Sequence, residues 1–505
     1  MTESTADEIV LDNMSQKFPM WKHQTEGVLK AIKQDSFAFF FEAGTGKTLT
    51  ALNTYRLRCW NDNKRLRLLI LCPLSVVQNW ASEIDKFTTE PESKVLPLDA
   101  GSVSKRNTKL SNWIKNVGEG GIVITNYDSL LNIDYVNMLH MEFQPEMIIF
   151  DESHRIKTPT AIRAKNCQHL AKSAKYKLLL TGTPSTKDEM DYFGQFLVMD
   201  GGKTLGANMT AFKNRYFKKI ILPFKVKMRN GQMINPRSWV MRESKNLDFL
   251  EAVASKSMYV AKDDCLDLPP LIRSTKTVAM TDHQAEVYGQ LQRDAIAFLD
   301  GAKVETPMAI TKTLRLLQVC SGHLPMPDGR VHDFAENNKK EALKDLLQEF
   351  LSNPHRKVLV WACFKHNYKE IRSVCEGLKV PYVELHGETP SGKRQANIDE
   401  FNKGKARVLI GHPASGGIGV NLTASDTSIY YSRDFSLENR LQSEARNYRG
   451  GSEVHKSVTH VDLVCAGTIE GNLVKLVQRK EKVTTAILKA LLQANDNNNN
   501  KEEQK

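Results

Sequence analysis

The sequence of 505 residues predicts an α/β protein with two parallel-sheet lobes in tandem and a helical insertion and linker between them. Three observations lead to this prediction. Short apolar segments alternate with turn residues and helical or polar segments, as in parallel sheets with helices on both faces. This rhythm occurs in two separate series along the chain. The length and a hydrophobic content of 41% also suffice for two or three domain cores.

The first series contains five short apolar segments, which we expect to be strands of one sheet: residues 37–41, 68–71, 121–125, 147–150 and 177–180. The second series begins at Lys357 and consists of the segments KVLVWA, PYVEL, ARVLIG, TSIYYS and SVTHVDLV. From about residue 200 to 350 the pattern changes to longer helical segments and a polar, proline-containing passage. We therefore expect an N-terminal extension at 1–17, a first lobe at 18–200, an insertion and linker at 201–350, a second lobe at 351–492 and a disordered, low-complexity tail at 493–505.

Composition argues against some classes of protein and leaves others open. The longest apolar runs are far shorter than the roughly 20 residues of a membrane span, and the acidic N-terminus lacks the layout of a signal peptide. We expect a protein of the cytoplasm or nucleoid, or of the nucleus in a eukaryote. The eight cysteines include no C-x-x-C pair, which argues against a zinc site or a disulfide framework and favours reduced thiols. The net charge of +12 fits a polyanionic partner, although many basic proteins bind none.

The segment FFFEAGTGKT, residues 39–48, nearly matches the phosphate-binding pattern G-x-x-x-x-G-K-[ST], but Phe41 occupies the first glycine position. Main-chain N–H groups of a glycine-rich turn before a helix can surround phosphate oxygens. This role is expected for Gly44, Thr45 and Gly46. Lys47 would reach the β and γ phosphates of ATP, and Thr48 would give its hydroxyl to Mg²⁺. The alternative is a tight glycine turn that only joins a strand to a helix.

The segment MIIFDESHRIK places two carboxylates, Asp151 and Glu152, at the carboxyl end of a buried strand, where open α/β sheets bind ligands. Asp151 would hold Mg²⁺, and Glu152 would orient and deprotonate the attacking water. A surface Asp-Glu pair that opens a helix is the alternative, but the upstream Gly-Thr-Gly-Lys-Thr argues against it. Downstream, LLLTGTP supplies Thr181 and Thr183, which together with His154 could couple the state of the γ phosphate to a neighbouring lobe.

These segments together resemble the Swi/Snf-like family of superfamily 2 helicase-type DNA translocases. The first lobe carries EAGTGKT, LLILCPLSVVQNWASEIDKF, ITNYDSL, DESHRIK and LLLTGTP. The second lobe agrees through KVLVWACFKHNYKEI, ELHGETPSGKRQANIDEFN and GHPASGGIGVNLTASDTSIYYSRDFSLENRLQSEARNYRGG. The resemblance runs from about Phe18 to about Leu492 and implies two RecA-like lobes, use of ATP and Mg²⁺, and DNA as the partner of a monomeric motor. The phosphate loop of this family usually lacks the first glycine, so Phe41 is no defect.

The resemblance also assigns roles to individual residues. In FPMWKHQ, Gln24 would read the adenine edge, unless it is simply a buried or solvated glutamine. In QSEARNYR, Gln442, Arg446 and Arg449 fall at i, i+4 and i+7, which predicts one shared helical face. Arg446 and Arg449 would act as arginine fingers when the lobes close; a solvated basic helix face is the alternative. The loop SGGIGVN would contact both DNA and nucleotide, the latter through Gly419.

Contacts to the DNA backbone require main-chain amides and short polar side chains on both lobes. The resemblance assigns them to one set of residues: Ser75, Gln78, Trp80, Thr125, Tyr127, Ser415, Gly416, Gly417 and Asn421. Each could instead be a capping or core residue, and a tryptophan such as Trp80 is more often packed than in contact with a ligand.

The expected function is a DNA-dependent ATPase with a D-E-S-H box that translocates on double-stranded or forked DNA. One departure from the family is the missing glutamine in RGGSEVHKS, which bears on the interface between the lobes and not on hydrolysis. The compact chain and the segment FKNRYFKKI resemble the annealing-helicase branch, which suits DNA repair, replication or recombination in a bacterium or virus. Two alternatives stay open: a strand-separating DNA or RNA helicase, and a non-hydrolysing DNA-binding scaffold.

Overall fold

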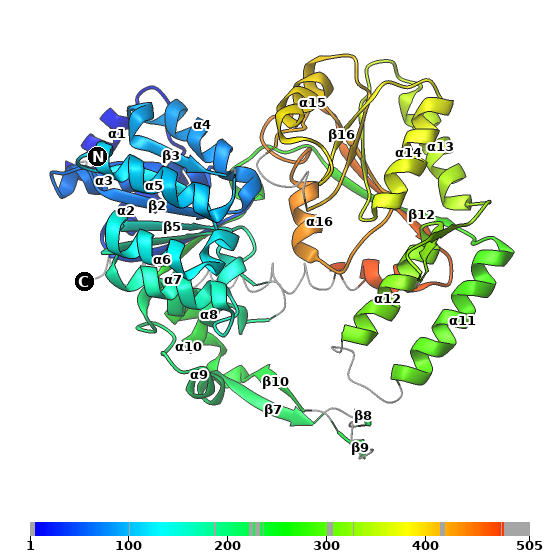
Figure 1. Cartoon of the computed structure of the whole chain (residues 1–505), viewed down its shortest axis with the longest axis horizontal. Coiled ribbons are helices and arrows are strands. Elements are labelled where there is room, and N and C mark those ends of the chain that lie inside the picture. The colour runs from blue at the N-terminus through cyan, green and yellow to red at the C-terminus, as the bar shows by residue number, and fades with distance from the viewer. Residues whose placement is uncertain are drawn as a thin grey trace. The chain divides into compact units, whose positions relative to one another are not determined.

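The fold was analysed in a computed structural model of the chain (Figure 1). The structure describes residues 6–99, 101–185, 188–221, 226–227, 233–235, 237–299, 307–326, 328–414, 420–475 and 477–478. The chain divides into two compact units. Unit 1 comprises Met1–Lys218, Val240–Leu266 and Lys482–Lys505, and unit 2 comprises Lys219–Trp239 and Asp267–Glu481. The predicted tail at 493–505 lies outside the described residues.

Unit 1 is built on a sheet of seven strands that all run parallel. In spatial order these strands are β11 (Ser257–Val260), β1 (Ser36–Phe41), β6 (Tyr176–Leu180), β5 (Met147–Asp151), β2 (Arg67–Cys72), β4 (Gly121–Asn126) and β3 (Val95–Leu98). The five strands predicted for the first lobe are therefore confirmed, with ends that differ by at most one residue. Because β1, β6 and β5 are neighbours, the loops that follow them emerge side by side at one edge of the sheet.

The sequence of β1 explains its central place. All six of its residues are buried, which suits a parallel strand covered on both faces. Phe37, Phe39 and Phe41 alternate onto one face, where successive rings lie 5.5 and 5.2 Å apart. Phe40 points the other way and contacts Tyr192 at a ring distance of 5.7 Å. Phe41 is the last residue of the strand, as predicted.

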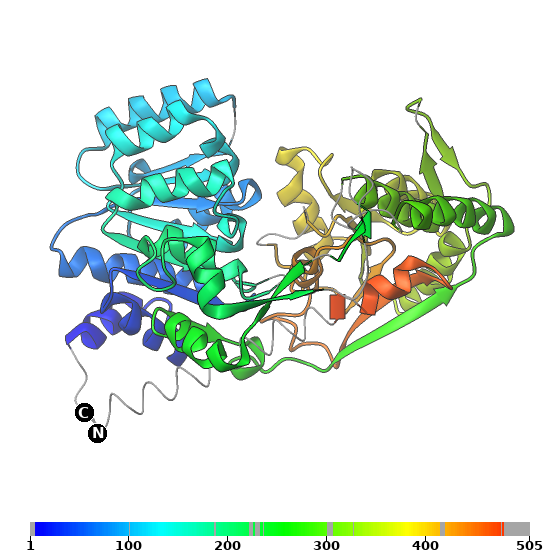
Figure 2. The same ribbon diagram turned by 90° about the horizontal axis from the view of Figure 1, so that it is seen from below.

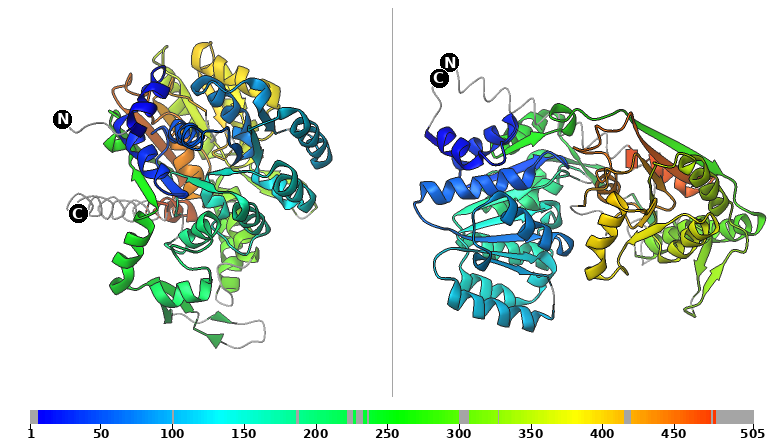
Figure 3. Two further views of the ribbon diagram at one scale, coloured as in Figure 1. Left: turned by 90° about the vertical axis from the view of Figure 1, so that its left-hand side faces the viewer. Right: turned by 90° about the horizontal axis from the view of Figure 1, so that it is seen from above.

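Helices cover both faces of this sheet (Figures 1 and 3). The chain moves from β1 outward to β3 and then returns, and right-handed crossovers place the outgoing and returning helices on opposite faces. The first group consists of α1 (Ala6–Ser15), α2 (Lys22–Ile32), α3 (Lys47–Asn61) and α4 (Val77–Phe87). The second group consists of α5 (Val103–Val117), α6 (Ile133–Met138), α7 (Ile162–Ser173) and α8 (Asp191–Asp200).

Unit 2 is built on a second sheet of six strands that also all run parallel. Its spatial order is β12 (Leu271–Val278), β19 (Val458–Cys465), β18 (Thr427–Tyr430), β15 (Val358–Trp361), β17 (Val408–Gly411) and β16 (Tyr382–Leu385). Helices lie on both faces of this sheet as well (Figures 1 and 2). The helices of unit 2 are α11 (Asp282–Leu299), α12 (Pro307–Cys320), α13 (Asn338–Leu351), α14 (Lys365–Gly377), α15 (Ser391–Lys403) and α16 (Leu437–Glu444). Of these, α11 and α12 pack against each other, and a small hairpin joins β13 (His323–Pro325) to β14 (Val331–Asp333).

Alternation along β15 separates the core of unit 2 into two layers. Val358 and Val360 pack with residues of α13 and α14, whereas Leu359 and Trp361 pack with Phe401 on the other face. The fold class predicted from the sequence, two RecA-like parallel-sheet lobes in tandem, is confirmed.

The stretch between the two series is less purely helical than predicted. It contains α9 (Met209–Tyr216) and α10 (Glu243–Ala254), as well as α11 and α12. It also contains β11 and β12, which add the edge strand next to β1 and the one next to β19. Further short strands are β7 (Phe217–Ile221), β8 (Val226–Lys227), β9 (Met233–Ile234) and β10 (Arg237–Met241). The predicted helical insertion and linker is confirmed, but its strands were not predicted, because edge strands are specified by pairing partners that lie far away in the sequence.

None of the helices in the described residues has both the length and the apolar character that a membrane span requires.

Candidate nucleotide site and its partner residues

The phosphate loop follows β1 and ends where α3 begins. Gly44 and Gly46 have φ values of 90° and 85°, a left-handed backbone that glycine adopts without a side-chain clash. The loop closes on itself, because the Thr45 hydroxyl donates to the Glu42 carbonyl at 2.8 Å. Lys47, the first residue of α3, directs Nζ back to the main-chain carbonyls of Phe41 (2.7 Å) and Glu42 (3.2 Å). Thr48 follows on the same turn and is half-buried.

Gln24 lies directly against this loop. A Cβ atom at Gly46 would come within 1.9 Å of Gln24 Nε2, so the position needs glycine for space as well as for its φ. Gln24 is 3% exposed. Its Oε1 accepts from the Trp21 N–H at 2.9 Å, and its Nε2 donates to the Thr45 carbonyl at 3.4 Å. The structure thus brings the predicted adenine reader to the phosphate loop, with its amide engaged at both ends.

The loop is also tied to β11, a strand from the middle of the chain. Glu42 Oε1 accepts from the Tyr259 hydroxyl at 2.9 Å, and Glu42 Oε2 accepts from the Lys262 N–H at 3.2 Å. The Glu42 N–H donates to the Val260 carbonyl at 3.0 Å. The acidic residue of EAGTGKT therefore anchors the loop to β11 and the turn that follows it.

Asp151 ends β5 and is held by three donors. Trp80 Nε1 donates to Asp151 Oδ2 at 2.9 Å, and the Glu152 N–H donates to Asp151 Oδ1 at 3.0 Å. The Tyr127 hydroxyl donates to the main-chain carbonyl of Asp151 at 2.7 Å. Trp80 comes from α4 and holds the carboxylate, whereas Tyr127 comes from the turn after β4 and holds the main chain, so two distant segments fix this residue.

Glu152 adopts φ 51° and ψ 53°, a left-handed conformation that is uncommon for a residue with a side chain. Such strain gathers at functional sites. Glu152 Oε2 lies 3.3 Å from His154 Nδ1 and 3.5 Å from Thr181 Oγ1. His154 Nδ1 lies 3.1 Å from the same Thr181 hydroxyl, so the three side chains form one polar triangle between β5 and β6.

A second link joins the carboxylate box to the loop after β6. The Ser153 hydroxyl donates to Gln195 Oε1 at 2.7 Å, and Gln195 Nε2 donates to the Pro184 carbonyl at 2.6 Å. Within the same loop the Thr183 N–H donates to Thr181 Oγ1 at 3.1 Å. A Cβ at Gly182 would lie 3.2 Å from the Phe41 carbonyl, so the loop passes close to the end of β1. The predicted coupling residues His154, Thr181 and Thr183 are therefore brought together beside Glu152.

The electrostatics of this edge favour a cation. Removal from water and the neighbouring Glu152 carboxylate raise the pKa of Asp151 to about 7, while Trp80 and Lys47 act in the opposite direction. Each Asp151 oxygen accepts one protein hydrogen bond and keeps a further lone pair. Carboxylate and hydroxyl oxygens are the ligands that Mg²⁺ prefers, so Asp151 and Thr48 fit the ion. Lys47 and the loop amides fit the phosphates.

In unit 2 the predicted arginines do not share one helical face, and this expectation was wrong. Helix α16 ends at Glu444, before Arg446 and Arg449. The helix ends because the chain turns back on the strand loops: the Leu422 N–H donates to the Arg446 carbonyl at 2.9 Å. The Arg446 side chain is 6% exposed and donates to the carbonyls of Gln442 (2.9 Å) and Val420 (3.2 Å). Arg449 is half-buried in the following turn.

A buried ion network lies behind α16. Arg440 pairs with Glu444 at 2.6 Å and with Asp462, and Arg273 of β12 pairs with Glu444 at 2.7 Å. The Arg440 guanidinium also stacks 3.6 Å above the Tyr430 ring. Burial opposes ionisation of Glu444, but Arg440, His460 and Arg273 together hold its pKa well below its usual range.

The predicted DNA contacts divide into exposed and buried residues. Ser75 and Gln78 are exposed, and Gln78 Nε2 donates to Asp99 Oδ2 at 2.7 Å. Trp80, Thr125 and Tyr127 are 3%, 0% and 1% exposed. Their polar atoms are used internally: Thr125 Oγ1 accepts from the Tyr135 hydroxyl at 2.9 Å, and the other two hold Asp151. These three side chains are buried, and their assignment to DNA contacts stays a prediction.

The remaining predicted contacts belong to the SGGIGVN loop of unit 2. Asn421 is exposed, and its Oδ1 accepts from the Thr423 N–H at 3.0 Å. The other predicted residues of this loop lie outside the described residues: Ser415, Gly416, Gly417 and Gly419.

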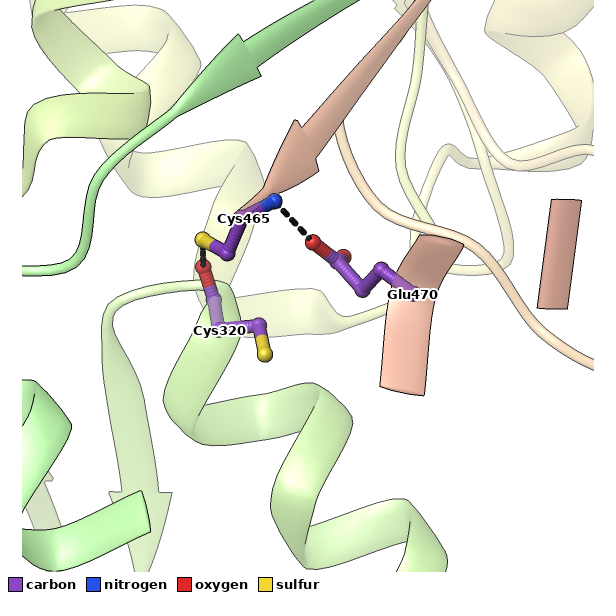
Figure 4. Close-up of side chains that lie close together, drawn as sticks. All are labelled: Cys320, Cys465 and Glu470. Carbon is purple, nitrogen blue, oxygen red and sulfur yellow. Dashed lines mark hydrogen bonds between the residues drawn. The ribbon is translucent and has the colours of Figure 1, made fainter. Parts of the chain in front are cut away.

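Unit 2 also contains a group of metal-ligand type, formed by Cys320, Cys465 and Glu470 (Figure 4). Their ligand atoms lie within 4.8 Å of one another, and all three residues are buried. Lys339 Nζ already pairs with both Glu470 oxygens at 2.7 and 2.9 Å. The Cys465 thiol donates to the Cys320 carbonyl at 3.3 Å, as Figure 4 shows. Because the Lys339 ammonium already neutralises the Glu470 carboxylate that a metal ion would need, we assign this group to the packing of unit 2.

Sequence reasoning missed several residues that shape the site. Gln195 bridges the two loops, and Tyr259 anchors the phosphate loop. Trp80 and Tyr127 were expected to contact DNA instead of Asp151. The signal available in the sequence was weak, because these residues lie 11 to 217 positions away from their partners and show no local pattern.

Comparisons with known proteins agree with this geometry. The chain matches the SNF2-related domain over residues 23–325 and the helicase conserved C-terminal domain over residues 338–451. It is similar to protein p41 of Acyrthosiphon pisum secondary endosymbiont phage 1, with 28% identity over 416 residues, which is 79% of this chain and 82% of that protein. It is also similar to the mouse chromodomain-helicase-DNA-binding protein 1-like, with 23% identity over 483 residues. That match covers 92% of this chain and 50% of the mouse protein.

An uncharacterized ATP-dependent helicase of Mycoplasma genitalium is 23% identical over 480 residues, which is 92% of this chain and 42% of that protein. The chain thus spans half or less of the length of the mouse and mycoplasma relatives. Among solved structures, the Sulfolobus solfataricus SWI2/SNF2 ATPase core in complex with dsDNA is similar over 94% of each chain, with 21% identity and a TM-score of 0.39. Because the SNF2-related model matches more than half of the chain, the chain belongs to the SNF2-related family of helicase-like proteins.

Proposed function

We propose that this chain is a DNA-dependent ATPase that converts ATP and water to ADP and phosphate and translocates on double-stranded or forked DNA. The observation that carries the proposal is the convergence of three loops at one edge of the first sheet. These loops bring Lys47, the Asp151–Glu152 pair and Thr181 together. Membership of the SNF2-related family supports the same class of activity.

The residues of unit 1 divide the work of hydrolysis. The main-chain amides of Gly44, Thr45 and Gly46 bind the phosphates, and Lys47 exchanges its carbonyl partners for the β and γ oxygens. Thr48 and Asp151 hold Mg²⁺, which when bound neutralises charge on the phosphates. Glu152 accepts the proton of the attacking water, and its contact with His154 and Thr181 orients the carboxylate.

The remaining nucleotide contacts are proposals from the family resemblance. Gln24 lies beside the loop, where an adenine could replace one of its internal partners. Gln442, Arg446 and Arg449 would complete the site from the second lobe, and Gly419 would contact the nucleotide from the SGGIGVN loop. Because such arginines act only when both lobes engage the nucleotide, hydrolysis would depend on lobe position, as a motor requires.

Translocation would follow from phosphate contacts that differ between ATP-bound and ATP-free states. Exposed Ser75, Gln78 and Asn421 are the candidates that the structure leaves accessible on the DNA-contacting motifs. Such binding is independent of sequence and weakens with salt, because it depends on phosphate neutralisation. A role in repair, replication or recombination, the cellular location and the domain boundaries given above all stay predictions.

The test is the rate of phosphate release over a panel of duplex, forked and single-stranded DNA and the matching RNAs. We expect stimulation by duplex or forked DNA and none by RNA. Absence of stimulation by every nucleic acid would overturn the proposal and favour the non-hydrolysing scaffold. A triplex-displacement assay run beside strand displacement of a labelled duplex distinguishes translocation from the alternative, a strand-separating helicase.

A further inference from the structure

The stretch between α8 and α10 has an unusual charge distribution. From Gly201 to Arg242 the sequence contains ten lysines and arginines and no aspartate or glutamate. This segment of 42 residues therefore carries a charge of +10, against +12 for the whole chain. Most of the net charge of the protein is concentrated in less than a tenth of its length, and no carboxylate within the segment neutralises it.

Much of this segment forms a β-ribbon. Strands β7 and β10 pair as a sheet of only two strands, and β8 pairs antiparallel with β9 nearer the tip. Figures 1 and 2 show β7 and β10 side by side. A two-stranded ribbon by itself has little stability in water. It gains stability when a partner covers it.

The described side chains of the ribbon are exposed and of two kinds. Lys218, Lys219 and Arg237 are exposed to solvent. Ile221 and Val240 are apolar but 66% and 41% exposed. Side chains of successive residues in a strand point to opposite faces. Lys218 and Lys219 are successive residues of β7 and both are exposed, so both faces of the ribbon are accessible to solvent. The ammonium of Lys219 lies 4.9 Å from the centre of the Trp239 ring, which keeps this charge at the surface.

These features select the chemistry of the partner. A surface of this charge density suits a polyanion, and the phosphate backbone of DNA offers one negative charge per about 1.7 Å of helix. The major groove of a duplex is wide enough for a two-stranded β-ribbon, and its thymine methyl groups accept apolar contacts. An acidic protein that bound through one surface would instead cover one face of the ribbon and leave the other exposed to solvent.

We propose that the ribbon of strands β7 and β10 is a separate DNA-binding element that docks on duplex DNA through phosphate contacts from Lys218, Lys219 and Arg237. The ribbon contains none of the residues assigned to ATP or to the motor motifs. It would hold DNA outside those motifs and raise the affinity of the chain for duplex. The identification of DNA as the polyanion rests on the proposed function.

The test compares two variants of the full chain that lose the same charge. The ribbon variant carries Lys218→Gln, Lys219→Gln and Arg237→Gln. The control carries Lys105→Gln, Lys115→Gln and Lys172→Gln, which removes three exposed lysines from α5 and α7. Duplex affinity is measured by fluorescence anisotropy at several salt concentrations, and thermal melting verifies that both variants fold.

For the ribbon variant we expect a Kd for duplex that is about tenfold higher near 0.1 M salt. The slope of log Kd against log salt should fall by about two to three, close to one per lost phosphate contact. The control should change Kd by less than threefold, and Lys218→Arg with Lys219→Arg should bind like the wild type. ATP turnover at saturating DNA should stay unchanged in all of them.

Equal affinity of the ribbon variant and the control would overturn the proposal. A ribbon-dependent preference for RNA of the same sequence, or for polyglutamate over duplex DNA, would also overturn it and identify the other class of partner. The two proposals fail separately: loss of ribbon-dependent binding with intact DNA-stimulated ATPase refutes only the ribbon, and the reverse result refutes only the motor.

Discussion

The polar sites of the two units differ in the charges that surround their buried carboxylates. In unit 1, Asp151 is held by the neutral donors of Trp80 and a main-chain amide, and its pKa is raised. In unit 2, Glu444 is surrounded by Arg440 and Arg273, and its pKa is lowered. In the first site Lys47 offsets only part of the negative charge, so the site is suited to bind a cation. In the second site Arg440, Arg273 and Arg433 already pair with the carboxylates, which suits it to hold α16 in place.

This comparison teaches that buried charge by itself does not identify a binding site. Both carboxylates are removed from water, but only Asp151 would gain from a dication, because Glu444 has its counter-charges within the chain. The same reasoning sets aside the cysteine group of unit 2, where Lys339 pairs with Glu470. Four predictions test the distinction, beginning with the largest effect.

The largest effect is expected from residues that act on the nucleotide. Lys47→Ala and Glu152→Gln should each lower the turnover of ATP by at least about a thousandfold, because they remove phosphate charge stabilisation and the proton acceptor. DNA affinity should stay within a few-fold of the wild type. Phosphate-release assays and anisotropy measure the two quantities. Equal loss of both would indicate misfolding and would remove the support for separate ATP and DNA functions.

Removal of one charge from each site should change stability in opposite directions. Arg440→Met leaves Glu444 and Asp462 short of a buried partner and should destabilise unit 2 by about 3 to 5 kcal/mol. Asp151→Asn removes an uncompensated charge and should raise the melting temperature by about 2 to 4 °C, although activity is lost. Denaturant unfolding followed by hydrogen exchange locates each effect in its unit.

Lys344→Met is the control for this pair. It breaks the exposed ion pair of Lys344 with Glu341 and should change stability by less than about 1 kcal/mol. Destabilisation by Asp151→Asn as large as that caused by Arg440→Met would contradict the comparison between the two units.

The pH dependence of Mg²⁺ use should reflect the raised pKa of Asp151, which lies at about 7. As the pH falls below 7, protons compete for this carboxylate, and the Mg²⁺ concentration for half-maximal ATPase should rise by about tenfold per pH unit. An ordinary aspartate would show this effect only near pH 4.

The stability contribution of the same group has a defined sign. The native state binds the proton of Asp151 more tightly than the unfolded chain does. The contribution of this proton to the free energy of unfolding is therefore complete below about pH 4 and is lost as the pH rises toward 7. Titration of the Mg²⁺ requirement at pH 6, 7 and 8 measures the functional effect. A requirement that does not change over this range would show that Asp151 ionises like an exposed carboxyl.

The smallest effect concerns the donor behind Asp151. Trp80→Phe keeps an aromatic ring in the core but removes the indole N–H, so the carboxylate loses one fixed hydrogen bond. The Mg²⁺ concentration for half-maximal activity should rise about threefold to tenfold, with little change in the maximal rate. Binding of a fluorescent ADP analogue with and without Mg²⁺ gives a second reading. An equal loss of metal-free nucleotide binding would point to general damage to the core.

Local patterns predicted much of this protein. The apolar segments formed strands of both sheets, and the glycines of EAGTGKT formed the expected turn after Phe41. The helical spacing of Gln442, Arg446 and Arg449 failed, because the Arg446 carbonyl pairs with Leu422 and the helix ends before it. A periodicity of three or four residues describes a helix only while no distant segment competes for its backbone groups.

The sequence alone determined the fold class, the family resemblance and the types of residue that bind nucleotide. These depend on how apolar and polar residues follow one another over short stretches of the chain. Tertiary structure decided which side chains support the site. Trp80 and Tyr127 hold Asp151, and Tyr259 anchors Glu42 across more than two hundred positions of sequence. Such contacts depend on which strands are neighbours in the sheet, and strand order is set by the packing of the whole lobe and not by any single segment.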